Sequence, residues 1–374
     1  MRTHLLIFLL CWIPVALADG LPDLGEAAQS DFSPHAERKI GERILHDIRL
    51  HEPAYLDDPE VGDYLNRLGK HLASQSEEAR QEFNFFVLRD PTLNAFAMPG
   101  GYIGVHTGLI LAARSESELA GVLAHEISHV TQRHLARLLG KQNQAQMAGL
   151  LSIALAILAS RQSAELAQGA LVAGQAAGVQ HQLNYSRDFE QEADRLGLQL
   201  LDKAGFDVRG MAGFFDRLQK FGRLYENNAP GYLRTHPLTT ERLADMENRI
   251  RTISYRQVPD STDFMLVRAR LRAAEGVARD AVTGFESRLA QRKFMHEAEE
   301  RYGLARALLR ANAPRLAKKE LDELRRLKIA SPMIETLAAE ILVALEESTG
   351  ALKILKEARV RYPQSRAIVY ALVE

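Results

Sequence analysis

The chain has 374 residues, and this length predicts two domains rather than one. Hydrophobic residues make up 46% of it, charged residues make up 25%, and the formal net charge is −1. This is the composition of an ordinary globular protein. A near-neutral chain is not suited to binding a polyanion, so we expect no nucleic-acid partner.

Residues 1–18 have the pattern of a cleavable signal peptide. Arg2 gives a positive start, residues 5–17 are apolar but too few to span a bilayer comfortably, and Ala16-Leu17-Ala18 forms an A-x-A cleavage site. A buried N-terminal helix is the weaker interpretation. A lipid anchor at Cys11 is disfavoured because the bulky Leu10 precedes it.

Cleavage would start the mature chain at about Asp19 and remove Cys11, which is the only cysteine. The mature chain would then have no disulfide and no thiol ligand. Any metal would be held by histidine, aspartate or glutamate, and stability would come from packing. An exported chain of this kind fits a bacterial periplasm.

The next part of the chain predicts helices followed by short strands. Apolar residues recur at three-to-four spacing between residues 33 and 78, which favours helix. The stretch FNFFVLRD (83–90) is rich in strand formers. Residues 94–98 and 102–106 predict two more strands, joined by a turn at Pro99-Gly100-Gly101.

A long helix is predicted from Ser115 to about Leu139, because Ser115 and Glu118 form a capping box and a mostly buried apolar pattern follows. The apolar runs 147–159 and 164–179 come next. The first would cover roughly 20 Å, short of a ~30 Å hydrocarbon core. We expect a helical hairpin packed on the body; the alternative is a flap that faces a membrane or a partner.

The remainder of the chain predicts helices only. They cover residues 186–205, 211–225 and 240–253, and then everything from about Pro259 onward. In the last part, RARLRA (268–273) recurs loosely as RALLRA (306–311), in a pattern that approximates the 34-residue tetratricopeptide unit. A plain helical bundle is the alternative. The sequence stops inside what resembles another helix, so we expect the repeat array to be incomplete or closed by another element.

The stretch AHEISHVTQRH (124–134) contains the motif H-E-x-x-H as His125, Glu126 and His129. On a helix, positions i and i+4 lie about 40° apart, so both imidazoles reach one ion. Glu126 sits beside them, where a base for metal-bound water belongs. His134 lies nine residues from His125, about 180° round the helix, and we expect it to face away at the surface.

A third metal ligand is expected from the helix SRDFEQEADRLG (186–197). Glu190 and Asp194 are one turn apart, so one can bind metal while the other orients a ligand histidine. Spacing alone does not rank the two. Glu192 should point away from both. The alternative is that these residues form a solvated acidic start of the helix.

HEISH followed by FEQEADRLG resembles the membrane-linked zinc metallopeptidases that include the heat-shock protease HtpX and the CAAX prenyl protease. Their shared pattern is H-E-x-x-H with a later E-x-x-A-D. The resemblance is greatest to the family of periplasmic β-barrel assembly-enhancing proteases, which NAFAMPGGYIGVHTGLI and THPLTTERLAD also fit. It implies that zinc is the cofactor, that Glu190 is its third ligand, and that Asp194 orients a ligand histidine.

The resemblance also implies roles for two residues near Thr235-His236-Pro237. The histidine of this loop can approach the zinc and hold the enzyme latent, although by sequence alone His236 is a loop histidine. Arg242 is a candidate to stabilise the oxyanion or to orient the loop. The predicted hairpin at 94–106 would offer an edge strand to an extended substrate.

These observations together predict a mainly α protein with a small β-sheet. A zincin-type metalloprotease domain is expected over residues 19–258, and a tetratricopeptide-like repeat domain over 259–374. The expected function is an exported zinc endopeptidase that degrades misfolded or stalled outer-membrane proteins. The alternative is a mostly latent chaperone or adaptor in outer-membrane β-barrel assembly, which would engage the assembly machinery through the repeats and contact the membrane peripherally. A membrane-embedded peptidase is disfavoured, because the mature chain lacks apolar spans of about 20 residues.

Overall fold

The computed structural model describes residues 33–76, 81–139, 187–224 and 231–373. The predicted signal peptide of residues 1–18 and the predicted apolar hairpin of residues 147–179 lie outside the described residues. Within the described ranges, no helix combines the length and the hydropathy that crossing a bilayer requires.

The chain opens with two helices, α2 (Pro34–His51) and α3 (Pro59–Ala73). The side chains of Ser33 and Asp58 accept hydrogen bonds from backbone N–H groups of the first turns, and a proline at the first helical position follows each cap. The helical prediction for this part is confirmed as two helices separated by a short extended segment.

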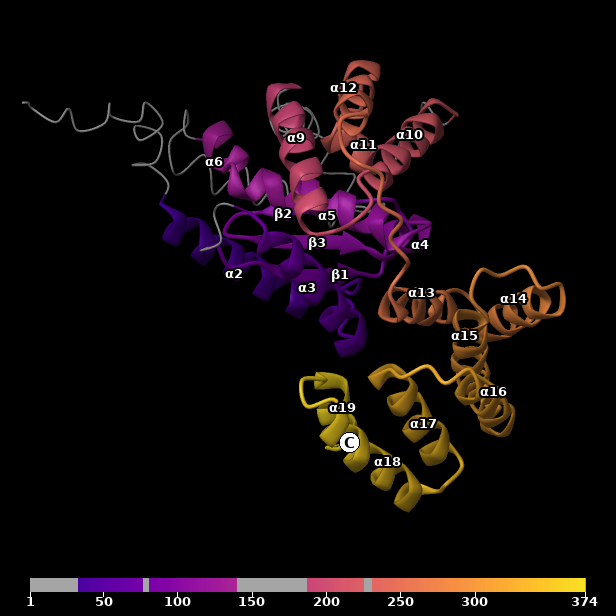
Figure 1. Ribbon diagram of the computed structural model, residues 1–374. Coiled ribbons are helices and arrows are strands. Elements are labelled where there is room, and N and C mark those ends of the chain that lie inside the picture. Colours follow the sequence, from indigo (N-terminus) through magenta and orange to yellow (C-terminus); the bar gives the residue numbers. More distant parts are fainter. Residues whose placement is uncertain (1–32, 77–80, 140–186, 225–230, 374) are drawn as a thin grey trace, which may run out of the picture.

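A three-stranded sheet lies at the centre of the N-terminal part (Figure 1). Its strands are β1 (Asn84–Leu88), β2 (Ala95–Met98) and β3 (Tyr102–His106), in the order β1-β3-β2. β1 pairs with β3 in parallel, and β2 pairs with β3 antiparallel. The two strands predicted around the Pro99-Gly100-Gly101 turn are therefore confirmed as a hairpin.

Both faces of this sheet are buried, because side chains alternate between two apolar clusters. Phe85, Val87, Ile103 and Val105 face the main core, which α3 and the helix that follows the sheet also enter. Phe86, Leu88, Phe96, Met98 and Tyr102 face Ile44 and Leu45 of α2. The sheet is thus the middle layer between α2 and the rest of the core.

After the short α4 (Thr107–Ala112), the central helix α5 (Glu116–Thr131) begins at the predicted cap, where the Ser115 side chain accepts from the Glu118 N–H. The prediction that it continues to Leu139 is wrong. Arg133 has a φ of 50°, which is left-handed backbone and ends the helix, and α6 (His134–Leu139) starts in a new direction. Arg133 is held there by an ion pair with Glu37.

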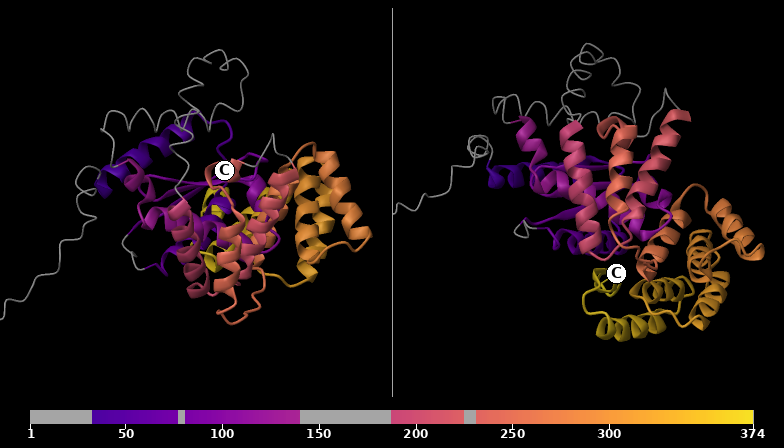
Figure 2. Two further views of the ribbon diagram at one scale, coloured as in Figure 1. Left: turned by 90° about the horizontal axis from the view of Figure 1, so that it is seen from above. Right: turned by 45° about the horizontal axis from the view of Figure 1, so that its top comes forward.

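Three helices follow on the side of α5 away from the sheet: α9 (Arg187–Lys203), α10 (Arg209–Leu224) and α12 (Thr240–Ile250). α9 and α10 pack directly on α5, and α12 packs on α9 and α10. They stand beside one another in two different views (Figures 1 and 2). The short α11 (Gly231–Thr235) lies between α10 and α12. All three predicted helices of this region are present, with ends displaced by a few residues.

The last part of the chain is a curved array of helices (Figure 1). Both ends of the array contact α3, since the first helix packs against α3 and α4 and the last returns to α3. The all-helical expectation is met; the tetratricopeptide assignment stays a prediction. The helices are α13 (Thr262–Ala274), α14 (Ala278–Ala290), α15 (Glu297–Arg310), α16 (Pro314–Arg326), α17 (Pro332–Ala344), α18 (Ser348–Arg361) and α19 (Arg366–Ala371).

Two buried carboxylates join this array to the rest of the molecule. Glu60 on α3 pairs with Arg270 of α13 and accepts hydrogen bonds from Tyr302 of α15 and Thr336 of α17. Glu116, the first residue of α5, accepts from the Ser261 N–H and hydroxyl just before α13. The array is therefore anchored to α3 and α5, the two helices that carry Glu60 and Glu116.

Two glycine substitutions test this description of the backbone. Gly100 has a φ of +76°, and a Cβ there would lie 2.3 Å from Arg38 Cα, so Gly100→Ala should lower the free energy of unfolding by about 1–3 kcal/mol. Gly213 is inside α10, and a Cβ added there would have nothing within 4 Å. Gly213→Ala should therefore raise the free energy of unfolding by about 0.5–1 kcal/mol. Urea denaturation followed by circular dichroism measures both, and equal effects at the two sites would contradict the turn geometry.

Candidate metal centre

His125 and His129 project from α5 into the interior of the molecule. They are 0% and 2% exposed, and their Nε2 atoms lie 3.0 Å apart. The edge of His125 meets Phe215 of α10 at a ring separation of 5.6 Å. The helix thus presents two imidazole nitrogens to one point inside an apolar core.

Glu190 reaches the same point from α9. Its Oε2 lies 3.5 Å from His125 Nε2, and its Oε1 lies 3.4 Å from His129 Nε2. This approach requires α9 to pack closely on α5. Gly197 allows it, because a Cβ there would stand only 3.2 Å from the backbone nitrogen of His125.

His236 completes a buried group of four. It follows α11, is 1% exposed, and places Nδ1 3.0 Å from Glu190 Oε1. Its ring stacks on Tyr232, with centroids 4.6 Å apart. One ligand atom from each of His125, His129, Glu190 and His236 lies within 4.8 Å of the other three.

The spacing of these atoms fits a metal ion. A tetrahedral zinc with ligand bonds of about 2.0–2.2 Å holds its ligand atoms roughly 3.3–3.6 Å apart. The contacts among His125, His129 and Glu190 measure 3.0, 3.4 and 3.5 Å. Two imidazole nitrogens facing each other at 3.0 Å, beside a carboxylate, form the donor set of a cation site.

Glu126 lies beside this group but is not one of its ligand atoms. It is 0% exposed, and its Oε1 lies 3.6 Å from His236 Nε2. Neither of its carboxylate oxygens has a hydrogen bond among the described residues. A buried carboxylate without a donor is costly, so this position implies a partner that belongs to the working site.

Asp194 and Arg242 lie behind His125. Asp194 Oδ1 is 3.0 Å from His125 Nδ1, on the side of the ring away from the cluster. Arg242 binds Asp194 through Nε and Nη2, at 2.7 and 2.8 Å. Its Nη1 lies 2.7 Å from Glu190 Oε2 and donates to the Pro237 carbonyl at 2.7 Å. The structure therefore places Glu190 among the candidate ligand atoms and Asp194 against the opposite side of the His125 ring.

His134 is a correction to the sequence analysis, which placed it at the surface. It is 0% exposed, because the break at Arg133 turns α6 and swings the ring back toward α5. Its Nδ1 lies 2.8 Å from His129 Nδ1, and its Nε2 lies 3.0 Å from Glu192 Oε2. Glu192 does point away from the candidate ligand atoms, as predicted. It is connected to His129 only through the ring of His134, which contacts both residues.

The charges of the group follow from its burial and its pairing. Burial would lower the pKa of His125, but its hydrogen bonds to Asp194 and Glu190 outweigh burial and raise it to about 9. Burial holds the pKa of His129 well below its ordinary value. Burial would raise the pKa of Glu190, but the three histidines outweigh it and hold that pKa well below the usual range. The carboxylate is ionised, which favours a cation beside it.

Comparison with known proteins agrees with this geometry. The model of peptidase family M48 matches residues 59–250, which is more than half of the chain and includes every residue of the cluster. The chain belongs to peptidase family M48.

The chain is also similar to proteins that carry names. The beta-barrel assembly-enhancing protease of Escherichia coli K12 is 34% identical over 346 residues, covering 91% of this chain and 70% of the relative. A Vibrio cholerae protein with a provisional form of the same name is 39% identical over 269 residues, or 72% of this chain and 55% of that protein. The mitochondrial metalloendopeptidase OMA1 of Schizosaccharomyces pombe is 30% identical over 185 residues, covering 49% and 51%.

The surroundings of the site include residues that the sequence analysis did not place there. Tyr232 is fully buried, and burial together with the Glu126 and Glu190 carboxylates raises its pKa well above the ordinary value. Its place four residues before His236 was the available signal, because i and i+4 share a helical face. His134 and Glu192 had no such signal, since their contact depends on the backbone at Arg133.

The contact between His134 and His129 gives a test of metal binding. If His129 binds the metal through Nε2, its Nδ1 carries a hydrogen and donates a hydrogen bond to Nδ1 of His134. Nε2 of His134 then donates to the carboxylate of Glu192. His134→Leu should therefore weaken metal affinity about 10–100-fold, while His134→Asn, which can keep an acceptor near the same place, should lose less. Competition with a chromophoric chelator measures the affinity. Equal affinities for wild type and His134→Leu would show that the ring only fills space.

Proposed function

We propose that the chain is a zinc-dependent endopeptidase. The observation that carries this proposal is the buried group of His125, His129 and Glu190 beside Glu126, in a chain of family M48. The carboxylate of Glu126 has no hydrogen bond among the described residues. Imidazole and carboxylate ligands suit zinc, and the observed donor spacing supports that choice.

In this proposal His125, His129 and Glu190 hold the ion. Zinc bound there supplies a Lewis acid that polarises the scissile carbonyl and activates water. Glu126 accepts the proton of the attacking water on a carboxylate oxygen, and its burial keeps competing solvent away. Because no described residue donates to that carboxylate, it is available to a water or to the leaving amine.

Asp194 and Arg242 act on the ligands and not on the substrate. Asp194 holds the Nδ1 side of His125, so that Nε2 faces the ion. Arg242 contacts Asp194, Glu190 and the Pro237 carbonyl at once. Because these contacts occupy the guanidinium, they favour the proposal that Arg242 orients the loop of residues 235–237. They disfavour the alternative that Arg242 stabilises an oxyanion.

His236 supports a latent form of the enzyme. A catalytic zinc needs one open position, and a fourth protein ligand closes it. In the structure His236 lies with the other three ligand residues, buried and stacked on Tyr232. We therefore propose that His236 caps the metal in the resting state and leaves when substrate binds. This same observation favours the second candidate function, a mostly latent adaptor.

The names of the relatives support a role in the bacterial envelope. Several are called beta-barrel assembly-enhancing proteases, and the pattern of residues 1–18 suits export. We propose that the chain works in the periplasm on misfolded or stalled outer-membrane proteins. In this proposal the helical array acts as a tetratricopeptide-like chaperone that contacts the β-barrel assembly machinery. Substrate would enter as an extended strand along β2, which has no second strand partner among the described residues.

Glu126→Gln tests the catalytic assignment. It should lower the rate of cleavage of an unfolded test protein by about 10²–10⁴-fold while leaving one zinc per chain, because it removes the base and no ligand. Cleavage is followed on gels and zinc by elemental mass spectrometry. The matched control is Glu241→Gln, which changes an exposed glutamate of α12. Wild-type rates in Glu126→Gln would sink the mechanism.

His236→Ala tests latency. Removing the cap should raise the cleavage rate about tenfold, the factor expected for a gate that is closed nine-tenths of the time. The matched control is His46→Ala, on the exposed face of α2. An unchanged rate would show that His236 does not cap the metal. A lower rate would instead assign His236 to the transition state or to zinc retention, and zinc content would separate those two.

A further inference from the structure

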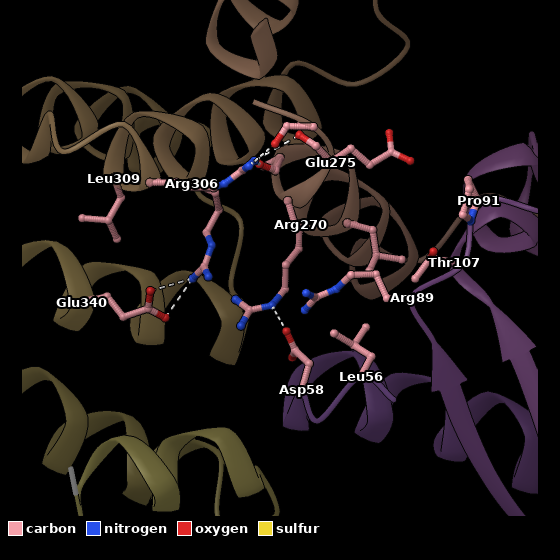
Figure 3. Close-up of a pocket in the computed structure, with 15 residues that line it drawn as sticks. Leu56, Asp58, Arg89, Pro91, Thr107, Arg270, Glu275, Arg306, Leu309 and Glu340 are labelled. Carbon is pink, nitrogen blue, oxygen red and sulfur yellow. Dashed lines mark hydrogen bonds and ion pairs between the residues drawn. The ribbon is translucent and has the colours of Figure 1, made fainter. Parts of the chain in front are cut away.

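A cavity of about 620 Å³ lies between the protease part and the helical array (Figure 3). One wall consists of Leu56 and Asp58 before α3, Arg89 and Pro91 after β1, and Thr107 at the start of α4. The other wall is formed by the C-terminal end of α13, by α15 and by Glu340 of α17. The roles assigned above to the metal centre do not use this cavity.

Three guanidinium groups converge in the cavity, those of Arg89, Arg270 and Arg306 (Figure 3). Arg270 uses Nε on Asp58 and Nη1 on Glu60, and Arg306 uses only Nη1 on Glu340. Among the described residues, no partner is found for Nη2 of Arg270, for Nε and Nη2 of Arg306, or for the side chain of Arg89. Arg89 is exposed, whereas Arg270 and Arg306 are partly buried. Guanidinium N–H donors that converge in this way are suited to binding an anion.

The charge of the cavity fits a monoanion. A fourth arginine, Arg310, donates only to the backbone carbonyls of residues 273, 275 and 276. The lining of the cavity thus holds four arginines and the carboxylates of Asp58, Glu275 and Glu340, which is an excess of one positive charge. The carboxylate of Glu275 points away from the guanidinium row (Figure 3).

The rest of the lining is apolar and adjoins the path proposed for substrate. Leu56, Pro91, Leu271 and Leu309 surround the guanidinium groups, so the anion would carry an apolar side chain beside it. Residues 89–94 run from the cavity wall to the start of β2. A chain added antiparallel to β2 would therefore direct its carboxyl end toward Ala95 and on toward the cavity.

We propose that this cavity binds the C-terminal carboxylate of a polypeptide that ends in an apolar residue. The proposal deepens the function above and rests on it, since the direction of the bound chain comes from the peptidase assignment. Planar guanidinium groups bind carboxylate bidentately, and apolar walls hold the terminal side chain. The cavity would select polypeptides by their C-terminal residue, and this selection would be separate from recognition of the peptide bond that is cut.

Binding of a labelled peptide tests this assignment in the mature chain that carries Glu126→Gln, which cannot consume the probe. The probe is a twelve-residue apolar-ended peptide with an N-terminal fluorophore, prepared both as the free acid and as the C-terminal amide. Fluorescence anisotropy should show the amide binding at least tenfold more weakly. Equal affinity of acid and amide would overturn the proposal.

Variants locate the binding. Arg89→Gln and Arg306→Lys should weaken the free acid to the affinity of the amide and leave the amide unchanged; Arg306→Lys keeps a charge beside Glu340 and loses the planar fork. The matched control, Arg315→Gln, changes an exposed arginine of α16 without a partner among the described residues. If neither cavity variant affects the acid while their melting temperatures match the parent, the acid binds elsewhere and the proposal is wrong.

The proposed function fails separately from this inference. Cleavage of an unfolded protein is measured with the chain that retains Glu126. Cleavage without discrimination between acid and amide overturns the cavity assignment alone. Discrimination without cleavage, by the wild-type chain and by His236→Ala alike, overturns the peptidase and leaves a protein that binds chain ends.

Discussion

Two carboxylates one helical turn apart, Glu190 and Asp194, govern the arrangement of the centre of this molecule. Both are nearly fully buried, and a buried charge is tolerated only when it is paired. Glu190 faces the histidines, whereas Asp194 joins His125 to Arg242. Satisfying them requires α5, α9, α11 and α12 to meet at one place. The helices are thus positioned by charge compensation as much as by apolar packing, and the apolar core then excludes water from the result.

Local patterns predicted the parts of this site that depend on neighbours in sequence. The spacing of His125 and His129 places them on one face of any helix, and the strand formers within residues 83–106 predict strands that the structure confirms as β1, β2 and β3. Spacing could not rank Glu190 against Asp194, because both lie on the same side of α9. Their ranking comes from how α9 crosses α5, and Gly197 sets how closely the two helices approach. That is tertiary information, which only the resemblance to a family supplied beforehand.

The error at His134 has a single physical origin. A helical wheel assumes continuous helix, and the left-handed backbone of Arg133 invalidates it one residue earlier. A non-glycine residue with positive φ persists when its surroundings stabilise it, and here Glu37 of α2 does so. Nothing near Arg133 in sequence indicates a partner 96 residues away. The same reasoning explains why local patterns do not predict the parallel pairing of β1 with β3, since it depends on a crossover and not on a turn.

The contacts of Glu60 and Glu116 make the helical array inseparable from the catalytic part. One apolar core runs from Val61 of α3 to Ile341 of α17 without a break at residue 258, where the domain boundary is predicted. A fragment ending there would expose Glu60, which would lose Arg270 and Thr336, together with the apolar surface of α3 that Phe264 covers. Returning apolar core surface to water costs about 25 cal/mol per Å², so uncovering this face of α3 would remove a large share of the stability of a whole domain. Loss of peptidase activity on truncation would consequently report misfolding of the enzyme, and only point variants can separate the work of the array from the integrity of the fold.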